Sequence, residues 1–188
     1  VDQLVEAMDG KLSIEDRFLL GQSLEHYRHL VNQVDEITVV IKRYVLERFE
    51  RKYNLLIELP GVSAIVAFVI LSEIGPNVEA FQSQGNLASW AGVCPGSYES
   101  AGIKKSSHTT QGNKYLKSSL FQAGGTAGRS KDEAFHNLYA RISGRSSKMK
   151  AIIACAHKMI RVIYKILSTG EHYDTKKALG LRQQARAI

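Results

Sequence analysis

A long stretch with regularly spaced apolar residues occupies the first third of the chain. Ser13 precedes Glu15 and Asp16, which is typical of a helix N-cap followed by acidic residues in the first turn. No proline interrupts the following stretch, so the pattern predicts one long helix over residues 14–58. Gly21 is the one position inside it where a break is expected, because glycine is a poor helix former.

The apolar positions in this helix recur in alternating steps of four and three residues, with only Thr38 off the pattern. A repeat of about 3.5 residues is typical of coiled coils. A helix of this length spans roughly 60 Å, so it either packs against another helix of its own chain or pairs with a second copy. We favour a homodimer or tetramer, because the seam is narrow and continues for several heptads. The seam residues are Leu20, Leu24, Tyr27, Val31, Val34, Ile41 and Val45.

Shorter helical patterns follow the Pro60-Gly61 stop, and none of the rest alternates as a strand would. The sequence therefore predicts an all-α fold, with a coiled-coil segment at 1–58, a compact helical domain at 59–175 and a frayed basic tail at 176–188. Residues 96–111 are rich in Gly, Ser, Thr and Lys and are predicted to form a loop. The predicted helices of the domain cover residues 62–74, 86–93, 113–127, 131–142 and 149–167.

The charge balance favours a polyanionic partner. The net charge is +7 and the isoelectric point is about 9.4, which suits nucleic acid or an anionic membrane surface. The longest apolar runs fall far short of the roughly 20 residues that a spanning helix needs, so we expect no membrane association. Cys94 and Cys155 are few and lack metal-ligand spacing, so we expect no metal site or cofactor in this chain and a reducing, cytoplasmic location.

The first candidate binding segment is Leu59-Pro60-Gly61-Val62, followed by Ser63 and a second apolar helix. This pattern resembles a helix-hairpin-helix element, which presents backbone N–H groups to a DNA phosphate without reading sequence. Gly61 and Ser63 are the candidate DNA-binding residues of this segment. The alternative is a plain corner between two packed helices.

The second candidate segment runs from Trp90 to Lys117. It contains serine hydroxyl groups among glycines, followed by several lysines. Ten Lys or Arg residues lie between Glu99 and Lys150 against three acidic residues, so this stretch alone carries +7. Charge concentrated in this way favours a phosphate-binding surface, although a solvated basic loop has the same composition.

These segments, in this order, resemble the C-terminal domain of the insertion-sequence one-ten transposase family, which also includes the insertion sequences one-sixteen and nine-oh-two and pilin-gene-inverting recombinases. The resemblance runs from about Leu55 to Tyr173. The matching segments are Leu59–Val62, Ile74–Gly75, Phe81, Leu87–Pro95, Ser100–Gly102, Gly112–Leu116 and Tyr139.

The resemblance implies a DNA transposase that cleaves and rejoins DNA through a phosphoserine intermediate. The family serine lies just before a small-residue–glycine pair, a place that Ser100 takes here, whereas Ser97, Ser106 and Ser107 are off register. Family members also contain an N-terminal RuvC-like domain that binds Mg²⁺ and a coiled coil. They use a non-coding RNA, the bridge RNA, to select the DNA. The DNA-binding residues that follow are Lys104, Lys105, Asn113, Lys114 and Lys117, of which the lysines supply positive charge near the reacting phosphate.

The chain departs from the family pattern in several places. Ser63 stands where the hairpin has glycine, Ala101 replaces the commoner glycine, and Lys117 stands where arginine is typical. The chain opens with a helix rather than with the strands of a RuvC-like half, so we expect this half to be missing and the chain to be inactive alone. The alternative function is a non-catalytic helix-hairpin-helix module for nucleic-acid binding and oligomerisation.

Overall fold

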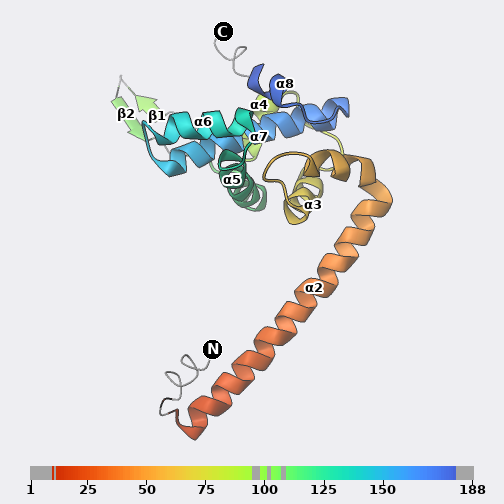
Figure 1. The fold of residues 1–188 in the computed structure, drawn as a ribbon, viewed down its shortest axis with the longest axis vertical. Helices are drawn as coiled ribbons and strands as arrows, with labels where there is room; N and C mark the ends of the chain where they lie inside the picture. The colour runs from red at the N-terminus through yellow and green to blue at the C-terminus, as the bar shows by residue number, and fades with distance from the viewer. Residues whose placement is uncertain (1–9, 11, 95–97, 101–102, 107–108, 181–188) are drawn as a thin grey trace. The chain divides into compact units, whose positions relative to one another are not determined.

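The computed structural model describes residues 10, 12–94, 98–100, 103–106 and 109–180, and for 98–100 and 103–106 it describes the backbone only. The chain divides into two compact units, Val1–Tyr44 and Val45–Ile188. Helix α2, Ile14–Ile57, begins in the first unit and ends in the second. The predicted long helix is thus confirmed (Figure 1). The helix continues through Gly21, and its non-helical dihedral angles lie instead at Phe49, with φ −134° and ψ 22°.

The first unit presents its apolar side chains to the outside. Among the predicted seam residues, Leu20 is 54% exposed, Tyr27 64% and Val34 62%. Val45 is different, because it is only 6% exposed and belongs to the core of the second unit. Its assignment to the seam was therefore wrong: the heptad spacing continues through this residue, but its side chain packs within its own chain.

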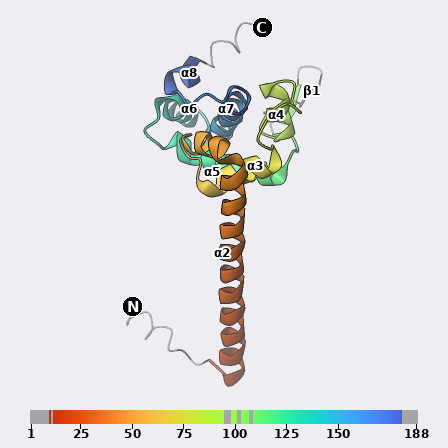
Figure 2. The same ribbon diagram turned by 90° about the vertical axis from the view of Figure 1, so that its right-hand side faces the viewer.

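The second unit is almost entirely helical, which confirms the all-α class. The last residues of α2, from Val45 onward, pack into this unit. Its further elements are α3 Ala64–Glu73, α4 Gln84–Trp90, β1 Tyr98–Ser100, β2 Ile103–Ser106, α5 Lys114–Gly128, α6 Glu133–Ser143, α7 Lys148–Thr169 and α8 Thr175–Gly180. Figures 1 and 2 show α6 lying alongside α7, and α3 lying next to α5.

Two elements differ from the sequence-based expectation. The predicted loop contains an antiparallel hairpin of β1 and β2, whose strands are too short to show an alternating pattern. The predicted frayed tail begins with α8, because Asp174 accepts hydrogen bonds from the Lys176 and Lys177 amides and Ala178 is buried. The rest of the tail, 181–188, lies outside the described residues.

The helices begin at residues whose side chains accept a backbone hydrogen bond. Ser63 caps α3, Ser83 caps α4 and Ser147 caps α7, each bonding the amide three residues later. Such caps satisfy N–H groups that have no partner inside the helix, and each typically contributes about 1 kcal/mol. The sequence-based helix limits are therefore off by only a few residues.

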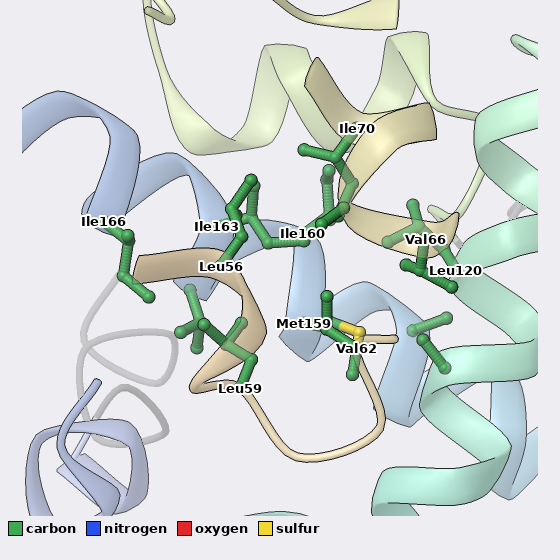
Figure 3. Close-up of a cluster of buried hydrophobic side chains, with 14 of the residues drawn as sticks. Leu56, Leu59, Val62, Val66, Ile70, Leu120, Met159, Ile160, Ile163 and Ile166 are labelled. Carbon is green, nitrogen blue, oxygen red and sulfur yellow. The ribbon is translucent and has the colours of Figure 1, made fainter. Parts of the chain in front are cut away.

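The core of the second unit forms around one face of α7. Figure 3 shows Met159, Ile160 and Ile163 meeting Leu56 and Leu59, and all five side chains are at most 1% exposed. The apolar residues of α7 recur every three or four positions, as an amphipathic helix requires. Among the described residues, no helix is long and apolar enough to cross a bilayer.

Helix α5 approaches its neighbours at backbone distance. A Cβ atom added to Gly124 would lie 2.7 Å from the Ala156 nitrogen of α7, and one added to Gly128 would lie 2.6 Å from the Tyr139 ring of α6. These glycines therefore set how closely the three helices pack. Of the adjacent residues Gly124 and Gly125, only Gly124 lies in such a close contact with a neighbouring backbone.

Substitution of the two adjacent glycines is expected to have opposite effects. Gly124→Ala should lower the free energy of unfolding by about 2 kcal/mol, because its methyl group overlaps the α7 backbone. Gly125→Ala should raise it by about 0.5–1 kcal/mol, because its methyl group meets only side chains, those of Ile152 at 3.6 Å and Arg129 at 3.8 Å, and alanine favours helix. Urea unfolding measures both, and a destabilised Gly125→Ala would contradict this packing.

Candidate functional site

The β1–β2 hairpin carries the candidate nucleophile. Ser100 is the last residue of β1 and pairs with Ile103, and Glu99 pairs with Lys104. The register shifts between Tyr98 and Glu99, which marks an irregularity in the first strand. Only the backbone is described here, so the predicted roles of the Ser100, Lys104 and Lys105 side chains lie outside the described atoms. Ala101, between the strands, also lies outside the described residues.

Two glycines bring together the chain segments that precede and follow this hairpin. Gly92 precedes the hairpin with φ +69°, and Gly112 follows it. A Cβ atom on Gly112 would overlap the Gly92 nitrogen and lie 2.6 Å from the Gly92 Cα atom, so two backbone segments cross in contact. Farther out, the Thr110 amide donates to the Cys94 carbonyl at 3.5 Å. The chain thus leaves and re-enters the helical body at one point.

Asn113 connects this crossing to three helices. Its Oδ1 atom accepts hydrogen bonds from the Tyr115 and Leu116 amides at 3.1 and 2.9 Å and so caps α5. Its own amide nitrogen donates to the Trp90 carbonyl, the last residue of α4, at 3.1 Å. Its side-chain Nδ2 atom donates to the Glu73 carboxylate at the end of α3. The residue therefore joins α3, α4 and α5 immediately after the hairpin, and any contact with DNA remains a prediction.

Lysines, rather than acids, occupy the first turn of α5. Lys114 is exposed, with its ammonium 4.9 Å from the centroid of the Tyr115 ring. Lys117 donates to the Thr110 carbonyl at 2.9 Å, which ties the helix to the returning end of the hairpin. Because the helix dipole already makes this end positive, the lysines add to a positive field beside the hairpin base.

Gly61 and Ser63 lie at the opposite end of α3 from Glu73. A Cβ atom on Gly61 would overlap the Ala123 carbonyl of α5 and lie 2.8 Å from the Ala127 nitrogen. The φ of +84° at Gly61 also requires glycine, so close packing against α5 is sufficient to explain this residue. Ser63 is exposed and caps α3. The predicted DNA-binding residues thus form two groups, separated by a helix of about 15 Å.

Sequence reasoning missed Glu73, and it did not assign Gly92 a role. The available signal for Glu73 was one acidic residue at the end of an otherwise apolar helix. Within the described part of the chain, no three His, Cys, Asp or Glu side chains come close enough together to hold a metal ion.

Comparison with known proteins identifies the domain that contains this site. Residues 53–140 match the model described as Transposase IS116/IS110/IS902 family. Over these residues the chain is similar to this transposase family. The matched segment contains α3, α4, the hairpin and α5, and therefore the contact between Gly92 and Gly112 and the residue Asn113.

Several curated relatives agree with this assignment. A predicted transposase from Sinorhizobium fredii is 28% identical over 156 residues, which cover 79% of this chain and 39% of the relative. Pilin gene-inverting proteins from Moraxella bovis and Moraxella lacunata are each 27% identical over 170 residues, which cover 88% of this chain and 52% of the relative. The chain thus spans between about 40% and half of the length of these relatives.

Removal of the Asn113 side chain is expected to destabilise the transposase more than removal of an ordinary cap. Asn113→Ala should lower the free energy of unfolding by about 2–3 kcal/mol, because it removes the cap of α5 and the partner of the Glu73 carboxylate. Ser147→Ala, which removes one exposed capping bond of 3.3 Å, is the control and should cost about 1 kcal/mol. Equal losses in thermal or urea unfolding would show that the contact with Glu73 is unimportant.

Proposed function

We propose that this chain is the DNA-joining part of a transposase in which Ser100 forms a covalent bond to DNA. The similarity of residues 53–140 to the transposase family supports an action on DNA as a transposase or recombinase. The observation that carries the finer proposal is the position of Ser100, at the end of a strand of the hairpin that precedes the lysine-bearing N-terminus of α5. A fixed base and a positive field are what a hydroxyl nucleophile directed at a phosphodiester requires.

The proposed step is a transesterification. The Ser100 Oγ atom attacks the phosphorus, the bond from phosphorus to one bridging DNA oxygen breaks, and that oxygen leaves as a hydroxyl after taking up a proton. The serine proton passes to solvent or to a base. The reverse step uses a DNA hydroxyl as the nucleophile and frees the serine. Because a phosphodiester replaces a phosphodiester, the strands are exchanged without an external energy source.

Positive charge assists this step in two ways. Lys114 at the start of α5, together with Lys104 and Lys105 on β2, would offset the charge that develops on the phosphate oxygens. A RuvC-like half would hold Mg²⁺ on its own acidic residues and complete the active enzyme. A bridge RNA would select the DNA ends, with no contact to it assigned in this chain.

The nucleophile is tested by replacing serines one at a time in the transposase that contains this chain and a RuvC-like half. Ser100→Ala should abolish the covalent protein–DNA adduct and recombination, while DNA binding changes little. Ser106→Ala and Ser107→Ala are the matched controls from the same segment and should leave adduct formation intact. Adducts are measured by denaturing electrophoresis with labelled DNA. Unchanged recombination by Ser100→Ala would instead indicate a non-catalytic module for nucleic-acid binding and oligomerisation.

We propose in addition that the first unit mediates self-association. The six predicted seam residues that lie within it, from Leu20 to Ile41, are between 39% and 64% exposed. Apolar rows of this extent are uncommon on isolated proteins and usually mark an interaction surface. A second copy of α2 would cover the seam with an identical one.

Light scattering on the chain tests this self-association. The unmodified chain should have at least twice its own mass of 20.9 kDa, and the double variant Leu24→Asp/Val31→Asp should approach the monomer mass. Gln22→Asp/Gln33→Asp adds the same two charges at exposed positions outside the seam and should leave the mass unchanged. An unmodified chain with the monomer mass would exclude the proposal.

A further inference from the structure

A region without acidic residues extends from Ala134 to Gly170. These residues include most of α6, the whole of α7 and the turn between them. They contain no Asp or Glu and seven Lys or Arg, so the region carries +7. Most of it lies beyond residues 53–140, the segment that matches the transposase family. The seven cations are Arg141, Arg145, Lys148, Lys150, Lys158, Arg161 and Lys165.

Some of these cations serve the packing of the second unit. The Lys158 ammonium donates to the Ala134 carbonyl at 2.8 Å and lies 5.5 Å from the centroid of the Phe135 ring. The Arg161 Nε atom donates to the Gln84 side chain at 3.2 Å. Burial lowers the pKa of Lys158, as expected for an ammonium inserted between helices. These two residues therefore have a structural use that accounts for their presence.

The cations at the turn between α6 and α7 have no such use. Arg145, Lys148 and Lys150 are exposed, and none of them has a carboxylate partner within the described residues. Arg141, in the last turn of α6, has Nε and Nη1 atoms that are buried without a hydrogen-bond partner among those residues. Because a guanidinium does not lose its proton in proteins, Arg141 adds a permanent positive charge beside the other three.

The lysines in the first turn of α7 lie where positive charge destabilises a helix. Helix dipoles favour acidic residues at the N-terminus, and α2 and α6 follow this rule with Glu15 and Glu133 in their first turns. The 22-residue helix α7 has no acid in its first turn and instead carries Lys148 and Lys150 there. Cations at this end of a helix are slightly destabilising. Stability of α7 therefore does not explain them, and an anionic partner would.

We infer that the turn between α6 and α7 binds the phosphate backbone of duplex DNA, at a surface distinct from the Ser100 hairpin. Arg145, Lys148 and Lys150 supply charge to successive phosphates, and the free amides at the start of α7 supply N–H donors. Contacts of this kind position DNA without reading its sequence, as a domain that joins different DNA ends requires. The assignment rests on the DNA-acting character of the family and not on the phosphoserine step.

The test is the salt dependence of DNA binding. The unmodified chain and the variant Arg145→Gln/Lys148→Gln/Lys150→Gln are titrated with a short labelled duplex between about 50 and 200 mM salt. The negative slope of log affinity against log salt concentration should become shallower by about 2 to 3 in the variant. Its affinity for the duplex at low salt should fall at least about tenfold. The thermal midpoint of the variant should stay equal or rise, because it removes cations from a helix N-terminus.

Two controls separate a surface contact from a general effect of charge. Lys131→Gln/Lys165→Gln/Lys176→Gln removes three exposed cations elsewhere in the second unit. Its DNA affinity should keep most of the salt dependence that the unmodified chain has. Arg145→Lys/Lys148→Arg/Lys150→Arg keeps the charge and should keep the slope. An equal loss in the first control, or no binding by the unmodified chain, would overturn the assignment.

Further outcomes distinguish this surface from its alternatives. A loss confined to a structured RNA, with duplex DNA unaffected, would overturn the choice of DNA. Ser100→Ala should bind the duplex with an unchanged slope. If Ser100→Ala still forms covalent adducts while the turn variant loses its slope, the phosphoserine proposal fails and the assignment of the turn stands.

Discussion

Contact between backbones at glycine is the constraint on which the second unit depends. Helix α5 packs against α7 at Gly124, against α6 at Gly128 and against the turn that carries Gly61. At each of these places a single methyl group would overlap a neighbouring backbone or ring. The close approach lets the apolar face of α7 meet residues from the end of α2, from α3 and from α5 in one core. A domain of modest size gains dense packing in this way, because dispersion attraction falls steeply with distance.

The same principle positions the candidate site. Gly92 and Gly112 bring the two ends of the hairpin segment into contact, and Asn113 fixes this point to the ends of α3 and α4 and to the start of α5. The segment that contains the hairpin is therefore anchored to the helices on both sides. Such an arrangement suits a side chain that must contact DNA in a defined geometry. A side chain held by a rigid scaffold loses little conformational entropy when the DNA binds.

Positive charge at helix N-termini is a second feature of this unit. Helices α5 and α7 of the second unit, which are 15 and 22 residues long, begin with lysines instead of the acids that their dipoles favour. Departures from local stability rules are expected at functional sites, where the binding partner compensates for the cost. Both helix starts are suited to phosphate, and α5 lies in the segment that is similar to the transposase family. One lies beside the hairpin that carries Ser100, and the other lies at the turn after α6.

The sequence by itself determined the helical class, the long first helix and most helix limits, because apolar spacing and capping residues are local signals. It also located the hairpin segment, although strands of three and four residues are too short to be recognised. Only the tertiary structure decided that Val45 faces the core, that Glu73 meets Asn113 across 40 residues of sequence, and that Gly92 touches Gly112. These facts depend on which segments pack together, and no local pattern encodes a contact between residues distant in the chain.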